Sequence, residues 1–288
     1  MEFIDGELIY FQVDLDPEIK LLKVVPISDV HYGNHMFSLS NFDRTLSYLK
    51  ATPDAVAILN GDLCESTIRS SKGDIFRQVG TPQDQRDWII EKLYPIRKKI
   101  LSLTDGNHEG RIYNDAGIDL SIDIATALGV PYRAGGVMLK ISFGRGNHRM
   151  PNAPFVYWAY HTHGYGGART SGAKAVKVER TSTFVNANAY FMSHDHQVNA
   201  ATANYLIADP RTHDEVRTLL DGSTQTFKVG RVTSQRKLLI KTNAYLKWGG
   251  YSERGGYPPV DLLTPIVYMV GQGDSFEYGK YPSVRAII

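Results

Sequence analysis

The sequence predicts an α/β fold in which two packed mixed β-sheets are flanked by helices. Short apolar runs alternate with helix-like segments in the first half, as in sheets built from βαβ units. The second half carries short β-like runs separated by turn residues, which favours antiparallel strands. The 288 residues fit one large domain, and their 42% hydrophobic and 22% charged residues exclude a mainly disordered or fibrous chain.

Three buried strands and three helices are predicted in the first half. The strands are the short apolar runs at residues 20–28, 55–60 and 99–104. The first helix begins near Ser40, which is a good N-cap residue and is followed by apolar residues at helical spacing.

The other two helices also carry start or stop signals. Thr81 caps the second helix and Pro82 takes its first position, whereas Pro95 kinks or ends it. The third helix, at residues 119–128, stops at Gly129.

The second half is predicted to be mostly strands. The apolar and β-branched runs that indicate them are residues 137–143, 155–160, 189–192, 201–208, 215–220, 227–233 and 237–242. The last four runs are expected to be antiparallel strands of a second sheet that packs on the first.

Composition limits the partners and the compartment. The net charge of +2 gives no overall field that would attract a polyanion. The single cysteine, Cys64, excludes an internal disulfide and a multi-cysteine zinc site, and it favours a reducing compartment or indifference to redox state. No apolar run approaches the ~18 residues of a membrane span, and the acidic start lacks an export signal. We therefore expect a soluble intracellular protein with no membrane partner, and the oligomeric state stays open.

Potential metal ligands follow five of the predicted strands, at the point where each strand ends. They are Asp29, His31, Asp62, Asn107, His108, His161, His163, His194 and His196. Each motif alone has an ordinary explanation, such as a turn or a packed histidine. Because ligands of open α/β sheets bind beyond the carboxyl ends of the strands, the joint pattern predicts that these stretches converge on one site.

These residue types suit a pair of divalent cations. Imidazole nitrogens and carboxylate oxygens bind such ions, and a shared carboxylate can bridge two of them. Two metals about 3.5–4 Å apart clamp a phosphoryl group and lower the pKa of bound water, so that a hydroxide attacks phosphorus in line with the leaving oxygen. We expect two divalent ions, manganese foremost, with iron, zinc or nickel as alternatives.

The order of the motifs resembles that of the calcineurin-like metallophosphoesterase superfamily. The matching motifs are Asp29-x-His31, Gly61-Asp62, Gly106-Asn107-His108-Glu109, His163-Gly164 and His194-x-His196. The resemblance covers about residues 22–197 and leaves a β-rich part at 198–288 within the same single domain.

A narrower resemblance is to phage and prophage members related to the DNA-repair exonuclease branch. It rests on residues 106–111, on residues 162–167 with Gly172 and Lys174, and on residues 255–259. It implies a cytoplasmic protein, in the host cytoplasm if the chain is phage-encoded.

The superfamily resemblance implies a role for each motif residue. It assigns one metal to Asp29, His31 and His196, the bridge between the metals to Asp62, and the second metal to Asn107, His163 and His194. His108 would face the substrate and stabilise or protonate the leaving oxygen. His161 ranks second to His163 as a ligand and is a candidate substrate contact.

Two positions depart from the family pattern. Ser193 stands where the family usually has glycine, and Glu65 stands where a second aspartate is common. Glu65 is also a candidate at the substrate site. If Glu65 or Glu109 orients His108, the longer side chain changes the geometry.

Basic residues near the motifs have two interpretations. Arg111 is a candidate phosphate contact, because a guanidinium matches phosphate oxygens, but a surface salt bridge explains it equally well. Residues 164–174 form either a substrate-side loop or a loop packed on its own domain. Three histidines are expected to be ordinary surface or packing residues, namely His35, His148 and His213.

Three functions stay in competition. The first is a dinuclear-metal phosphodiesterase that acts on DNA as a nuclease, with Tyr165, Trp248 and Tyr251 stacking on bases. The second is a phosphomonoesterase for a nucleotide, phosphoprotein or small metabolite, since the same metals serve both reactions. The third is a metal-stabilised binding module without catalysis, against which the presence of His108 weighs.

Overall fold

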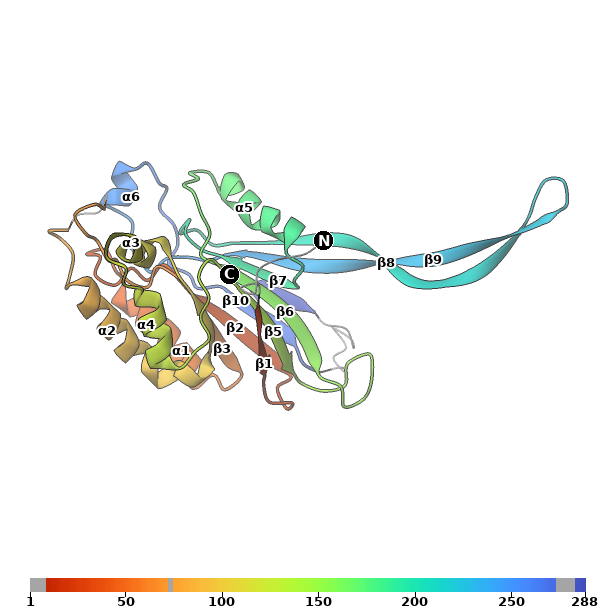
Figure 1. The fold of residues 1–288 in the computed structure, drawn as a ribbon, viewed down its shortest axis with the longest axis horizontal. Coiled ribbons are helices and arrows are strands. Elements are labelled where there is room, and N and C mark those ends of the chain that lie inside the picture. The colour runs from red at the N-terminus through yellow and green to blue at the C-terminus, as the bar shows by residue number, and fades with distance from the viewer. Residues whose placement is uncertain (1–8, 72–74, 273–282) are drawn as a thin grey trace.

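The computed structural model describes residues 9–71, 75–272 and 283–288, and its strands form two sheets (Figure 1). In spatial order the six-stranded sheet comprises β1 (Tyr10–Asp14), β5 (Val137–Phe143), β6 (Phe155–Thr162), β7 (Ala189–Met192), β9 (Thr224–Lys241) and β8 (Asn199–Thr218). The five-stranded sheet comprises β11 (Val284–Ile287), β10 (Ile266–Val270), β2 (Leu21–Ile27), β3 (Ala55–Asn60) and β4 (Ile100–Thr104). Both sheets mix parallel and antiparallel neighbours, as predicted.

Helices flank the two sheets (Figure 1). They are α1 (Leu39–Ala51), α2 (Pro82–Leu93), the 3-10 helix η1 (Tyr94–Lys99), α3 (Asn107–Ala116), α4 (Leu120–Leu128), α5 (Ser171–Phe184) and α6 (Tyr251–Arg254). The predicted packing of two sheets flanked by helices is therefore confirmed. Among the helices of the described ranges, none combines the length and the apolar character that a membrane span requires.

The main core lies between the sheets. Alternate residues of β5, such as Leu139 and Phe143, point inward and pack with Val24 and Ile58 of the other sheet. Full burial of each such side chain stabilises the fold by roughly 1.5–3 kcal/mol. A second cluster packs α1, α2 and α4 on the far face of the five-stranded sheet, and a third packs α5 on the six-stranded sheet. The central strands β2 and β3 are thereby covered on both faces.

Local sequence signals explain most helix ends. Thr81 and Asp84 form a capping box at the start of α2, and Pro95 lies in η1, directly after α2 ends. The prediction for the first helix is wrong by two residues, because the N-cap of α1 is Ser38 and not Ser40. The backbone NH of Ser38 donates to the carbonyl of Tyr245, and this long-range bond sets the helix start.

The four β-like runs between residues 201 and 242 are two long strands and not four short ones. β8 and β9 pair from Asn199 with Lys241 to Thr218 with Thr224. Pro210 lies between two of the predicted runs. There β8 continues through a register shift between Ala208 and Thr212, which an edge strand tolerates. The pair also joins the same sheet as β7. Its outer part, from the pair Leu206 and Ser234 to the turn, projects from the body as a two-stranded ribbon that we call the hairpin arm (Figure 1).

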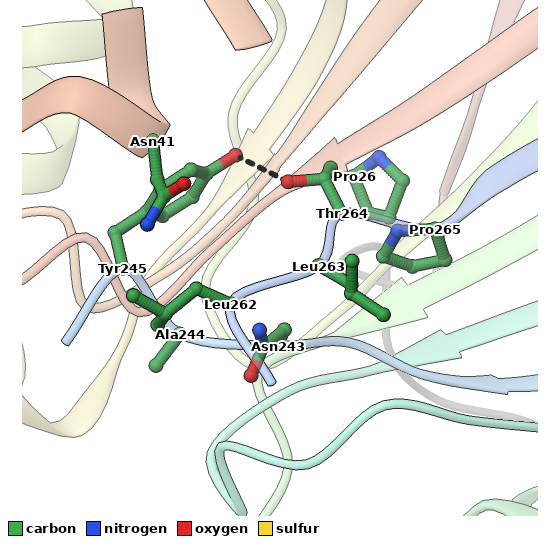
Figure 2. A pocket seen from close by; sticks show the side chains of 9 residues that line it. All are labelled: Pro26, Asn41, Asn243, Ala244, Tyr245, Leu262, Leu263, Thr264 and Pro265. Carbon is green, nitrogen blue, oxygen red and sulfur yellow. Dashed lines mark hydrogen bonds between the residues drawn. The ribbon is translucent and has the colours of Figure 1, made fainter. Parts of the chain in front are cut away.

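The segment after β9 braces the end of β2. The backbone NH of Tyr245 donates to the carbonyl of Asp29 over 3.0 Å, and Ser28 Oγ donates to the carbonyl of Asn243 over 3.2 Å. Figure 2 shows the hydroxyl of Tyr245 bonded to Thr264 beside a crevice of about 10 Å³, which holds at most about one water. The crevice is therefore a packing feature, and the hydrogen bonds from Tyr245 and Ser28 fix the backbone next to Asp29.

Candidate metal centre

The predicted ligands converge where β2, β3, β4, β6 and β7 end. Three overlapping groups place their ligand atoms within 4.8 Å of one another: Asp29, His31 and His196; His31, Asp62 and His108; and Asp62, His163 and His194. The strand ends thus bring together residues from five separate stretches of the chain, as the sequence predicted.

The first group has the spacing of ligands around one cation. His31 Nε2 lies 3.2 Å from His196 Nε2, which lies 3.2 Å from Asp29 Oδ1. Ligand atoms about 2.1 Å from a single metal are about 3.0–3.4 Å apart. Asp29 Oδ1 is buried and has no hydrogen-bond partner among the described residues. A buried carboxylate oxygen without a donor fits a position that a cation fills.

The second group has the same spacing. His163 Nε2 lies 3.1 Å from Asp62 Oδ2, 3.0 Å from Asn107 Oδ1 and 3.2 Å from His194 Nδ1. His163 Nδ1 donates to the carbonyl of Asn60, so its Nε2 is the nitrogen that faces the other ligands.

Asp62 joins the two groups. Its Oδ2 lies 3.1 Å from His163 Nε2 and 3.7 Å from His31 Nε2. Its Oδ1 accepts from the backbone NH of His108 over 2.8 Å, at the positive end of α3. One carboxylate is therefore held between both nitrogen clusters.

Two glutamates contact the ligands on the side away from the other ligand atoms: Glu65 contacts a ligand side chain, and Glu109 contacts ligand backbone. Glu65 lies 3.2 Å from His31 Nδ1 through its Oε2, an arrangement that orients a metal-ligating histidine. Glu109 accepts from the backbone NH groups of Asp62 and Cys64, over 3.0 and 2.8 Å. Neither carboxylate is hydrogen-bonded to His108, whose Nδ1 donates to the backbone carbonyl of Glu65 over 2.6 Å. The backbone contact is thus the hydrogen bond that fixes the ring of His108, and Glu65 Oε2 lies 3.7 Å from the same nitrogen.

Backbone strain is concentrated at this centre. Within the described residues, six residues other than glycine have positive φ: Asp29, His31, Asp62, Ser66, His194 and His196. Five of them are predicted metal ligands, and such conformations cost about 1–3 kcal/mol each unless their surroundings impose them. The strain therefore favours a functional site on grounds independent of residue type.

Opposite charges shift the titration of the buried ligands. Burial alone raises the pKa of Asp29, but the charge of His196 outweighs it and lowers the pKa to about 2. Burial likewise lowers the pKa of His31, but Glu65 and Asp62 raise it to about 9. For His163 burial is again outweighed, and Asp62 raises its pKa to about 10. These histidines thus hold protons where a divalent cation would place its charge.

His108 faces the cavity beside the ligands. Its Nε2 lies 3.9 Å from Asp62 Oδ2, and its side chain is 18% exposed. Burial, together with the charges of His31 and Arg111, lowers its pKa to about 4 against the opposing effect of Asp62. A pKa this low leaves His108 neutral at pH 7, and negative charge beside the ring would favour its protonated form.

His161 is not brought to the cavity. β6 extends to Thr162, so the ring of His161 lies inside the core, where its Nε2 is 2.7 Å from Ser102 Oγ and its Nδ1 is 3.0 Å from Asn60 Oδ1. Burial lowers its pKa to about 3. The expected substrate contact of His161 is not supported by this position, because both ring nitrogens already have partners in the protein.

The centre opens into a cavity of about 1050 Å³. Its basic lining residues are His35, Arg77, Arg111, Lys174, Lys247 and Arg254. Arg111 lines this cavity, and so does His35, which we expected to be an ordinary surface residue. His148 and His213 are not part of the lining.

Of the three predicted stacking residues, Trp248 lines the cavity and is 46% exposed. Tyr165 is exposed and does not line it. The side chain of Tyr251 lies outside the described part of the structure.

Sequence analysis missed the ion pairs behind the last motif. Asp195, between His194 and His196, contacts Lys177 Nζ over 2.6 Å and Lys241 Nζ over 2.7 Å. Lys177 belongs to α5, which begins at Ser171, within the stretch predicted as a loop. A lysine in the apolar end of β9 was the available signal, because a buried lysine requires an acid partner.

Comparisons with family models and with curated proteins gave no match. Among solved structures, the chain is similar to Vacuolar Protein Sorting 29 from Cryptosporidium parvum, with 13% identity over 93% of this chain and 98% of that chain and a TM-score of 0.41. It is also similar to a predicted phosphoesterase from Streptococcus pneumoniae, with 10% identity over 93% and 99% of the two chains and a TM-score of 0.35. These values are low, so the functional case rests on the geometry of the site itself.

Proposed function

We propose that this chain is a metal-dependent phosphoester hydrolase that holds two divalent cations. The observation that carries the proposal is the position of Asp62, whose Oδ2 lies within 3.7 Å of nitrogens from both ligand groups. A shared carboxylate between two sets of imidazoles suits a pair of cations better than one.

The ligand roles follow the two groups. The first ion is assigned to Asp29, His31, His196 and the shared Asp62, and the second to Asp62, Asn107, His163 and His194. Two such ions, when bound, polarise a phosphoryl oxygen and provide a nucleophile at neutral pH. Manganese is the proposed metal, with iron, zinc or nickel as alternatives.

His108 is proposed to act on the leaving oxygen. Its Nδ1 bond to the Glu65 carbonyl fixes the ring, so Nε2 is the atom available to the substrate. A phosphoester anion in the cavity would raise the pKa of His108 and favour its protonated form. The imidazolium could then donate its Nε2 proton to the departing oxygen.

A phosphodiester, with DNA as the leading candidate, is the proposed substrate. The cavity of about 1050 Å³ is large for a small phosphomonoester, and its lining gathers basic side chains although the whole chain carries only +2. Local positive charge beside an exposed Trp248 is the combination that grips a phosphate backbone and stacks a base.

Hydrolysis of model esters tests the proposal. We expect the manganese-loaded protein to cleave bis(p-nitrophenyl) phosphate faster than p-nitrophenyl phosphate, and to cleave DNA oligomers. A faster rate on the monoester would show a phosphomonoesterase. Absence of cleavage of every substrate, with two ions bound per chain, would leave only a metal-stabilised binding module.

A further inference from the structure

Among the described residues Lys174 has no acid partner, in contrast to Lys177 and Lys241, which pair with Asp195. The residue is only 3% exposed and yet lines the cavity. No carboxylate of the described residues lies within ion-pair distance of its ammonium group, and no hydrogen bond to it is formed there. A largely buried cation without a counter-charge is less favourable than a paired one, and an anion in the cavity would offset that cost.

The acid that acts on Lys174 already pairs with two other lysines. Asp195 acts electrostatically on Lys174, but its Oδ1 binds Lys177 at 2.6 Å and its Oδ2 binds Lys241 at 2.7 Å. Two lysines thus neutralise Asp195 more than fully, and Lys174 adds a third positive charge. The local excess of positive charge faces the cavity, because Lys174 and Asp195 both line it.

The first turn of α5 presents Lys174 to this space. Thr170 caps the helix by accepting from the backbone NH of Ala173, and the backbone NH of Lys174 donates to the Thr170 carbonyl. Residues 166–168, just before the cap, line the same cavity. The positive end of a 14-residue helix therefore lies beside the unpaired ammonium group.

We propose that Lys174 is a substrate-binding residue that holds a phosphate oxygen in the cavity next to the metal centre. This role rests on the proposed function for its substrate, but it is carried by the separate observation of a buried lysine without a counter-charge. An anionic phosphate oxygen supplies the missing partner, whereas a neutral ligand would not.

Binding of inorganic phosphate tests the assignment without requiring turnover. We expect Lys174→Ala to raise the calorimetric Kd of the manganese-loaded protein for phosphate about tenfold, which corresponds to 1.4 kcal/mol. Lys174→Arg should restore most of the affinity, since the positive charge remains. The matched control is Arg180→Ala, an exposed cation on the same helix, which should leave the Kd unchanged.

Metal content and secondary structure are measured on each variant. An unchanged phosphate Kd in Lys174→Ala, with two ions still bound, would overturn the assignment. An equal loss in Arg180→Ala would also overturn it, because it would show a general effect of charge. If the wild-type protein binds phosphate but hydrolyses no ester, the proposed function fails while the role of Lys174 in anion binding stands.

Discussion

The metal centre and the hairpin arm differ in how far their residues are buried and in which contacts hold them in place. At the centre, Asp29 and Asp62 are buried, have positive φ and are held by contacts from several elements. In the arm, Leu206, Val216 and Val232 are 79%, 62% and 62% exposed. Contacts from several elements therefore fix the centre, and they allow its strained backbone to persist. The arm depends on the backbone hydrogen bonds between its own two strands.

One strand, β9, links the two regions. At its root Lys241 is buried, donates to the carbonyl of Ser193 and pairs with Asp195. Farther out, Lys228 is exposed and pairs with Asp214 across the ribbon. A buried ion pair whose partner is removed costs about 3–5 kcal/mol, against about 0–1 for an exposed one. We therefore expect the energetic influence of β9 on the centre to end at its root.

The largest effect should come from Asp62→Asn. Loss of the shared negative charge should reduce kcat/KM by about a thousandfold or more, or about 4 kcal/mol of transition-state stabilisation. Steady-state rates on bis(p-nitrophenyl) phosphate and metal analysis of the purified variant check this. Two bound ions with unimpaired turnover would show that the assignment of the bridge is wrong.

His108→Ala should separate chemistry from metal binding. We expect turnover to fall about 10²–10⁴-fold, the usual contribution of a positioned acid, while metal content stays at the wild-type value. Asn114→Ala, at an exposed position of the same helix, is the matched control. Retention of the full rate in His108→Ala would remove His108 from the mechanism.

Gly106→Ala should weaken metal binding through geometry alone. A Cβ at Gly106 would lie 2.1 Å from Asp62 Oδ1, so the bridging carboxylate would have to move. We expect a loss of metal affinity of about 10–100-fold, as for changes that disturb ligand orientation. Gly110→Ala, on the first turns of α3 with open space around it, should leave the affinity unchanged. Competition with a metallochromic chelator measures both, and equal affinities would contradict the steric argument.

Much of the centre was predictable because residue type and strand position carry the information. A strand such as β3 is recognisable as an apolar run, and the Gly61-Asp62 pair directly after it lies at the ligand edge by topology. This rule and the family resemblance together predicted the ligand groups.

The rest depended on contacts between distant residues. Nothing near Asp195 in the sequence indicates that Lys177 and Lys241 neutralise it, and the burial of His161 depends on how far β6 extends. The length of β8 was missed because Pro210, a strand breaker by local rules, is tolerated in an edge strand. Positive φ at Asp29 is likewise imposed by tertiary packing and has no local sequence signal.

Metal affinity should rise with pH. The pKa of His31 is raised to about 9 and that of His163 to about 10, so both hold a proton at pH 7 in the ion-free protein. An ion must displace these protons, so each one makes affinity rise about tenfold per pH unit below its pKa, and the rise should flatten above about pH 9–10. Titration calorimetry in buffers of different ionisation enthalpy counts the protons released. Affinity independent of pH between 6 and 8 would contradict this charge state.

The smallest effect should come from shortening the arm. Ala208 pairs directly with Val232, so residues 209–231 can be replaced by Asn-Gly, which closes a two-residue hairpin turn. Because Lys241, Asp195 and the root of β9 stay in place, we expect metal content unchanged and turnover on bis(p-nitrophenyl) phosphate within about twofold of wild type. A large loss of metal in the shortened chain would mean that the arm supports the centre from outside the body. Loss of DNA cleavage with unchanged model-ester hydrolysis would instead assign the arm to holding the polymer, and the two regions would then be parts of one site.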